Sequence, residues 1–253
     1  MTAVYARIKS RLLNTIITDV VVQVRANFYL ATGFVLLVWL GFISFLPPAA
    51  ETFMPMILLT NLVVTAFWFI AGLMLLEKDQ GVLVGLIVTP LRPIEYVSSK
   101  VLTLSFLAVA ENVLIVLMTR VFWQVEGMSL IESLLQPNYL WIVVGLLINS
   151  VLFCLLGFFS VLRFDSFNAF LPPATLITLL FELPALVYLG VPETPLFYLL
   201  PTQAPLLLFE AAYSGIETWQ LLYAIAYPTL WIVVAFALSQ RSFRNFVIRH
   251  VGG

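Results

Sequence analysis

The sequence predicts an all-α fold, a polytopic membrane bundle of six transmembrane helices, and two observations support this prediction. Of the 253 residues, 62% are hydrophobic and only 10% are charged, and the mean hydropathy is +1.07. A water-soluble globule of this size needs more polar surface than that. The hydrophobic residues also gather in runs that match the about 20 helical residues needed to cross a bilayer. No alternating strand pattern indicates a β-barrel.

Six apolar runs qualify as spans, and together they make residues 1–253 a single transmembrane domain. We expect the spans at 28–46, 54–76, 101–123, 139–162, 168–189 and 220–238. Spans one and two thus fall within 28–76, and spans three to five within 101–189. The remaining pieces are an N-terminal segment (1–27), a loop (77–100), a segment between spans five and six (190–219) and a tail (239–253).

The distribution of Lys and Arg predicts the orientation, because loops rich in these residues stay in the cytoplasm. With a cytoplasmic N-terminus, only Arg120 of the twelve Lys and Arg residues falls outside. The eleven others are Arg7, Lys9, Arg11, Arg25, Lys78, Arg92, Lys100, Arg163, Arg241, Arg244 and Arg249. Both termini are therefore expected in the cytoplasm, with an even number of crossings.

The segment 1–27 has the pattern of an amphipathic helix that lies in the cytoplasmic interface. Apolar residues recur every four positions, at Val4, Ile8, Leu12, Ile16, Val20 and Val24. The basic residues fall mostly on the other side, where they can face anionic lipid headgroups. Two roles are open for this helix, a plain surface anchor or an elbow that shifts with a cytoplasmic partner.

The loop 77–100 is unusually apolar for a cytoplasmic segment. Glu77, Lys78 and Asp79 place charge at the membrane boundary, and Asp79 can cap a short helix that Pro90 ends. That helix, 80–88, holds too many Val, Leu and Ile side chains to leave in water, yet it is too short to span. It therefore needs a docking surface, on a partner or on the underside of the bundle itself.

Three stretches of this region resemble the signature of type-2 ABC transporter permeases, the class that exports drugs, antibiotics and polysaccharides. They are Glu-Lys-Asp-Gln-Gly-Val-Leu at 77–83, Val-Thr-Pro-Leu-Arg-Pro-Ile-Glu-Tyr at 88–96, and Ser-Lys-Val-Leu at 99–102. Val82 and Val84 depart from the pattern, which usually has polar residues there. The resemblance implies that 80–89 is the coupling helix, which sits in a groove of the ATP-binding subunit. The residues expected to couple to that ATPase are Asp79, Gln80, Gly81, Leu83, Leu86, Ile87, Thr89 and Pro90.

The resemblance also implies the partners and the location. Two copies of an ABC ATPase subunit would bind Mg-ATP, and a second permease chain would complete a homodimer or heterodimer in a bacterial or archaeal cell membrane. The family has an outer re-entrant hairpin that forms the external gate, and the Pro-interrupted stretch 190–219 would supply it here. The gate candidates are Pro192, Pro201 and Pro205, and a collapsed outer loop is the alternative.

Ionisable residues inside spans are expensive and are therefore candidates for function. Glu111 lies near the middle of span three and Glu182 in the outer half of span five, while Asn61 and Asn149 offer polar groups on spans two and four. These four are our candidates for the translocation path. For Glu111 the alternative is a buried carboxyl that only joins helices through hydrogen bonds.

Absent motifs restrict the function further. The chain has no phosphate-binding loop, so ATP hydrolysis and its cofactors must belong to another subunit, and no catalytic motif or metal site is evident. A net charge of −1 argues against nucleic acid. We expect a permease that moves hydrophobic or amphipathic compounds outward. The alternatives are an intramembrane enzyme that uses Glu111 and Glu182 as an acid and base, or a membrane scaffold without transport.

Overall fold

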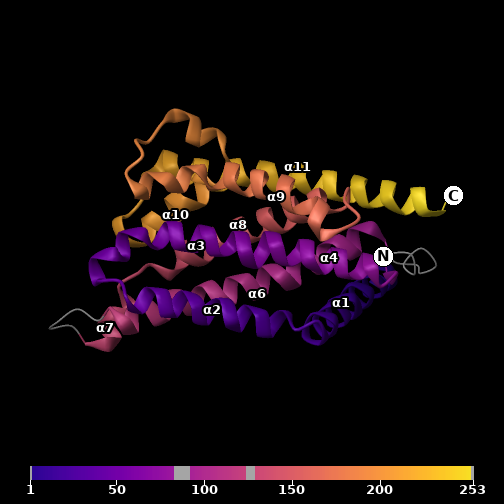
Figure 1. The fold of residues 1–253 in the computed structure, drawn as a ribbon, viewed down its shortest axis with the longest axis horizontal. Helices are drawn as coiled ribbons and strands as arrows, with labels where there is room; N and C mark the ends of the chain where they lie inside the picture. Colours follow the sequence, from indigo (N-terminus) through magenta and orange to yellow (C-terminus); the bar gives the residue numbers. More distant parts are fainter. Residues whose placement is uncertain (1, 83–91, 124–128, 252–253) are drawn as a thin grey trace.

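The computed structural model describes residues 2–82, 92–123 and 129–251, with side chains described from 11 to 245, and every regular element in these ranges is helical. The long helices lie side by side along the long axis of the molecule (Figure 1). We call the end where α4 (Phe69–Asp79) ends and α6 (Pro93–Phe122) begins the proximal end. The opposite end carries the short helix α7 (Leu130–Leu135) and is called the distal end.

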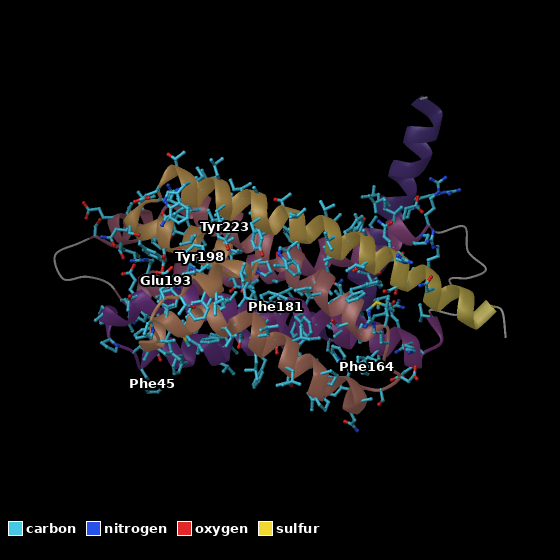
Figure 2. The ribbon with its side chains drawn as sticks, turned by 90° about the horizontal axis from the view of Figure 1, so that it is seen from above. Phe45, Phe164, Phe181, Glu193, Tyr198 and Tyr223 are labelled. Atoms are coloured by element: carbon cyan, nitrogen blue, oxygen red, sulfur yellow. The ribbon has the colours of Figure 1, made fainter. Side chains whose placement is uncertain are left out.

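The N-terminal helix α1 (Thr2–Arg25) meets α2 (Phe28–Ser44) at a bend of 63°. Asn27 makes the bend, because it adopts a left-handed conformation with φ 61°. Figure 2 shows α1 projecting sideways from the bundle at the proximal end. Its apolar stripe is exposed at Leu13 and Ile17, as expected of a helix in contact with lipid.

Span two is longer than the expected 54–76, because its helix runs without a break from Pro48 to Asp79. It consists of a 3₁₀ turn (Pro48–Phe53), α3 (Met54–Leu62), a π-helical segment η2 (Val63–Trp68) and α4. A π-helical insertion inside an α-helix is rare and often marks a functional position. In this protein it lies at mid-span.

Two boundaries predicted for the helices were wrong, and one helix was not predicted. Helix α6 begins at Pro93 rather than 101, so the last part of the expected loop is helical. Helix α11 (Thr218–Val251) continues through most of the expected tail at 239–253. The short helix α7 was not expected at all.

Close helix packing holds α8 (Tyr139–Val161) at the centre of the bundle. Gly157 on α8 lies so close to span two that a Cβ atom there would approach the carbonyl oxygen of Phe67 to 2.6 Å. Gly145 leaves room for the ring of Phe209 on α10 (Gln203–Ser214), which a Cβ atom would approach to 2.7 Å. Small residues at such crossings allow backbones to approach within van der Waals contact in membrane bundles.

Span five consists of α9 (Phe167–Glu182) and the 3₁₀ segment η4 (Leu183–Leu189). Between spans five and six, a second 3₁₀ helix, η5 (Pro195–Leu199), precedes α10. Helix α10 is largely buried and packs against α8 and α11. It is too short to cross a bilayer.

Among the described residues, five helices are long and apolar enough to cross a membrane: Pro48–Asp79, Pro93–Phe122, Tyr139–Val161, Phe167–Leu189 and Thr218–Asn245. The bent pair Arg11–Arg25 and Phe28–Ser44 makes a sixth if it is counted as one span. The prediction of a helical multi-pass membrane protein is confirmed, with five or six spans.

Candidate functional site

A buried cluster of charged and polar side chains joins three helices at the proximal end. The ammonium group of Lys100 on α6 forms ion pairs with Asp19 of α1, at 2.9 Å, and with Glu77 of α4. Lys100 is only 1% exposed, and both carboxylates are buried. The hydroxyl groups of Tyr96 and Ser99 donate hydrogen bonds to Glu77 and Asp19, respectively. We call these five residues the proximal charge cluster.

The cluster fixes the register between α1 and α6. Ser99 bonds to Asp19, and one turn further on Gln23 donates to the hydroxyl of Thr103 at 2.7 Å. Both pairs are separated by 80 positions, so the two helices run in parallel and advance together along this contact. A helix that is tied to its neighbour at two successive turns cannot slide past it without breaking buried hydrogen bonds.

The last helix is connected to the same place. The ring of Phe243 on α11 stacks on Tyr96 with centroids 4.6 Å apart, and the Lys100 ammonium lies 4.7 Å from the Tyr96 ring centroid. Span two, span three, α1 and α11 therefore meet within one set of contacts. The chain leaves this set after Glu77 and returns to it at Tyr96, so the hydrogen bond between these two residues joins the two ends of the segment that connects α4 and α6.

That segment contains the residues predicted to couple to an ATPase, and most of them lie outside the described residues. Leu83, Leu86, Ile87, Thr89 and Pro90 belong to this group. Asp79 is the last residue of α4 and not the N-cap that we expected, because α4 continues past Leu76 and Gln80 is its C-cap. Gly81 follows with φ 70°, a conformation that favours glycine and ends the helix.

Polar side chains also gather inside the membrane-spanning part, where the sequence placed the translocation path. Asn61 and Thr65 lie next to the carboxyl group of Glu111, so spans two and three meet here. Neither oxygen of Glu111 and no side-chain polar atom of Asn61 or Asn149 makes a well-aligned hydrogen bond within the described part of the chain, although Asn61 and Thr65 lie close enough to Glu111 to donate to it. Asn61 lies just before the π-helical segment and Thr65 lies within it, which makes this polar contact between spans two and three a candidate functional position.

The other predicted residues lie apart from this group. Glu182 is the last residue of α9, and neither carboxyl oxygen of Glu111 makes a hydrogen bond to it. Pro192 is exposed, whereas Pro201 and Pro205 are buried at the start of α10. The structure therefore does not join Glu111 and Glu182 into an acid and base pair.

Arg120, the one basic residue predicted on the outer side, is neutralised. It lies in the last turn of α6 and forms an ion pair with Glu51, while Gln136 accepts a hydrogen bond from it at 3.3 Å. Its guanidinium also lies 5.2 Å from the ring centroid of Tyr213. A paired arginine adds little to the charge asymmetry between the two ends.

Sequence reasoning missed the proximal charge cluster. Asp19 and Gln23 belong to the segment 1–27, which the sequence predicts to lie in the lipid interface, and Lys100 belongs to the predicted loop 77–100. One signal could have indicated the contact: Asp19 and Gln23 are four residues apart, as are Ser99 and Thr103, and such spacing puts each pair on one helix face.

The fold and these polar positions define a multi-pass membrane protein of the transporter class, because polar groups buried in spans typically mark the path of a substrate or ion. The chain belongs to the fluoroquinolones export permease protein family, whose model matches residues 10–251. Two curated proteins named fluoroquinolones export permease protein, from Mycobacterium tuberculosis strains CDC 1551 / Oshkosh and ATCC 25618 / H37Rv, are similar to it. Each is 30% identical over 250 residues, which cover 96% of this chain and 99% of the relative. The predicted resemblance to exporter permeases is confirmed.

Proposed function

We propose that this chain is the membrane-spanning permease subunit of an ATP-driven ABC exporter. Two permease chains, identical or paralogous, form the path, and two copies of a separate ATPase subunit bind Mg-ATP and drive transport. Both termini face the cytoplasm of a bacterial or archaeal cell, α1 lies in the cytoplasmic interface, and α2 supplies the first of six spans. The outer re-entrant segment, with Pro192, Pro201 and Pro205, forms the external gate.

One observation carries the coupling part of this proposal. Glu77 and Tyr96, which flank the segment 80–89, are hydrogen-bonded to each other, and Lys100 ties them to α1. A push on that segment by an ATPase would therefore move spans two and three and α1 together. Such a connected set of buried contacts is the kind of element that can transmit a displacement. The N-terminal helix accordingly acts as an elbow rather than as a plain anchor.

The proposed substrates are hydrophobic or amphipathic compounds. The printed names of the two relatives make a fluoroquinolone the first compound to test. Asn61, Glu111 and Asn149 line the path in this proposal. All three are buried in this conformation, so a substrate would reach their polar atoms when the spans separate during transport. Glu182, which is half-buried at the end of α9, lies nearer the exit.

Charge placed on the coupling segment tests the proposal. Leu83→Asp and Ile87→Asp should each prevent binding of an ABC ATPase encoded beside this chain, and should abolish ATP-dependent efflux. Leu135→Asp is the control, because Leu135 is a 73% exposed residue of α7 at the distal end and should tolerate the same change. If ATPase binding and efflux survive both substitutions, the assignment of the coupling segment is wrong.

The two alternatives make different predictions. An intramembrane enzyme would act without an ATPase, and the separate positions of Glu111 and Glu182 do not favour it. A scaffold would leave ATP-driven efflux unchanged when the chain is deleted. Efflux measurements on cells that lack this chain therefore separate the scaffold from the exporter.

A further inference from the structure

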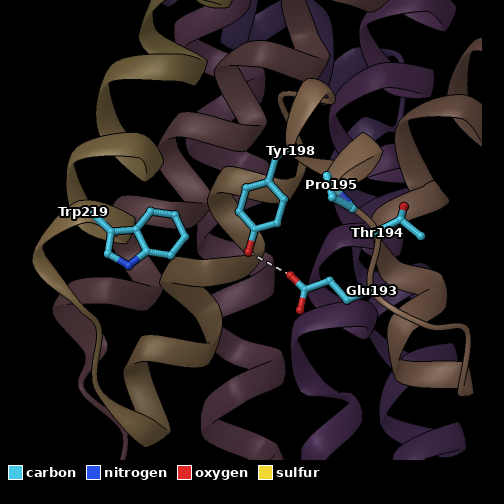
Figure 3. A pocket seen from close by; sticks show the side chains of 5 residues that line it. All are labelled: Glu193, Thr194, Pro195, Tyr198 and Trp219. Atoms are coloured by element: carbon cyan, nitrogen blue, oxygen red, sulfur yellow. Dashed lines mark hydrogen bonds between the residues drawn. The ribbon is translucent and has the colours of Figure 1, made fainter.

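The distal end of the bundle contains a pocket whose outer part lies in the segment 190–219 but includes none of the predicted gate residues Pro192, Pro201 and Pro205. Its outer part is an open cavity of about 460 Å³ lined by Glu193, Thr194, Pro195, Tyr198 and Trp219 (Figure 3). Its inner part is a smaller cavity of about 110 Å³ that shares Glu193 and Tyr198 with the outer part. We call the two parts together the distal pocket. Figure 2 shows Glu193, Tyr198 and Tyr223 near one another, at the end of the bundle opposite Phe164.

The pocket is acidic, and its inner part is built from paired polar groups. Glu193 accepts a hydrogen bond from the Tyr198 hydroxyl at 2.8 Å, and Glu210 accepts one from the Tyr188 hydroxyl at 2.5 Å. Burial and then the neighbouring Glu193 raise the pKa of Tyr198 to about 12, so the phenol remains a donor at neutral pH. None of the residues that line either cavity is a lysine or an arginine.

One polar atom in the inner part has no partner. Gln203, at the first position of α10, lines the inner cavity and is only 6% exposed. Its side-chain oxygen Oε1 is buried and accepts no hydrogen bond from the described residues. An unsatisfied buried acceptor beside two carboxylates leaves room for a donor or a positive charge.

Aromatic rings form the wall between the carboxylates and α11. The ring centroids of Tyr198 and Trp219 are 6.2 Å apart, and those of Tyr198 and Tyr223 are 5.4 Å apart. The Tyr223 hydroxyl donates to the backbone oxygen of Tyr198 at 2.7 Å, which fixes η5 against α11. The wall is therefore held in place without a ligand. Aromatic faces attract cations, and quaternary ammonium groups are typically recognised in this way.

We propose that the distal pocket binds an organic cation that carries an aromatic group, with the charge between Glu193 and Glu210 and the aromatic group against Tyr198 and Trp219. The two carboxylates attract the positive charge of the ligand, and the rings of Tyr198 and Trp219 offer a flat surface against which its aromatic group can pack. In the orientation of the proposed function the pocket opens to the outside, and it is then a site that a departing cationic substrate occupies on release. Only this last role rests on the proposed function.

The test measures binding without transport. The full chain in lipid nanodiscs is titrated with benzyltrimethylammonium and, separately, with neutral benzyl alcohol, by ligand-observed NMR with empty nanodiscs as the blank. We expect saturable binding of the cation only. Glu193→Gln and Glu210→Gln should each weaken it about tenfold, because each removes one charge and keeps the shape. Tyr198→Leu should weaken it about three- to tenfold, because the ligand's aromatic group loses one of the two rings it packs against.

Glu217→Gln is the matched control. Glu217 is an exposed carboxylate at the same end that bonds to the Trp219 indole at 2.5 Å but lines neither cavity, so its removal should change the affinity less than about twofold. Binding equal for both probes, no binding above the blank, or equal effects of Glu193→Gln and Glu217→Gln would each overturn the inference. Glu193 is exposed, so Glu193→Gln should fold normally and tests the inference even if Glu210→Gln does not fold.

No ATPase or ATP is present in this measurement. If the unchanged chain does not bind the cation but supports ATP-driven efflux, the inference about the distal pocket is refuted and the proposed function stands. If the unchanged chain binds the cation but supports no efflux, only the proposed function is refuted.

Discussion

Replacing Lys100 by methionine is the most direct perturbation of the proximal charge cluster. Methionine keeps most of the apolar stem and removes only the ammonium group. That group is bonded to Asp19 at 2.9 Å and also to Glu77, and all three side chains are buried. The substitution therefore leaves two buried carboxylates without their shared positive partner.

The size of the effect follows from this geometry. Removing one partner of a buried ion pair costs about 3–5 kcal/mol, because the remaining charge stays desolvated. Tyr96 and Ser99 still donate to the two carboxylates, which places our expected loss near the lower end, at about 3 kcal/mol. Folded proteins are stable by only about 5–15 kcal/mol, so the loss should be easy to detect.

The assay is the free energy of unfolding of the purified chain, from denaturant titration in detergent micelles. Lys78→Met is the matched control. The Lys78 side chain is 16% exposed and its ammonium donates to Asp165 at 2.5 Å and to the Phe164 carbonyl at 2.9 Å, but the Asp165 side chain is 93% exposed, so the carboxylate left behind is in water. Losing a pair whose remaining charge is solvated costs about 0–1 kcal/mol. The triple variant Asp19→Asn, Glu77→Gln, Lys100→Met should recover much of the loss, because it leaves no unpaired charge. Equal effects of Lys100→Met and Lys78→Met would refute the reasoning.

Three further predictions concern other parts of the bundle. Gly157→Ala should destabilise the chain by about 1–3 kcal/mol in the same titration, because its Cβ would meet a backbone carbonyl, whereas Gly72→Ala, with nothing within 4 Å of its Cβ, should be neutral or stabilising; equal effects would contradict the packing of α8. Glu111→Gln should change the unfolding free energy by less than about 1 kcal/mol yet slow efflux several-fold if Glu111 lines the path, and unchanged efflux would exclude that role. Hydrogen bonds from the Ser129 backbone and hydroxyl lower the pKa of Glu132 in the folded chain. The capping that Glu132 gives α7 is therefore present above the unfolded-state pKa and lost as pH falls through the lower folded-state pKa. Hydrogen-exchange protection of Leu130–Leu135 should drop in that acidic range and should not drop in a Glu132→Gln chain.

The spans could be predicted from the sequence because bilayer thickness imposes a length on each apolar run. Helix ends could not, because several helices continue in polar sequence beyond the apolar run. Helix α6 extends to Pro93 because Glu95 caps its first turn through the Arg92 backbone, and apolar counting ignores such polar helix starts. Helix α11 likewise continues past Leu238, since packing of Phe243 on Tyr96 stabilises turns that lie beyond the apolar run.

The candidate sites divide along a similar line. Asn61 and Glu111 were predicted at similar depth on neighbouring spans and do lie together. The pairing of Lys100 with Asp19 and Glu77 depends on how α1 packs along α6 after the bend at Asn27. No pattern in the local sequence predicts the direction of that bend. Contacts between distant segments such as these require the three-dimensional arrangement.

Reconstitution tests the central claim most directly. The chain is placed in liposomes with an ABC ATPase that binds it, with the ATPase side facing out, and accumulation of a fluoroquinolone in the lumen is followed over time. The account predicts accumulation that requires ATP and both chains, and that Leu83→Asp abolishes. Transport at the same rate without ATP or without the ATPase, or no transport of any amphipathic compound by the intact pair, would contradict it.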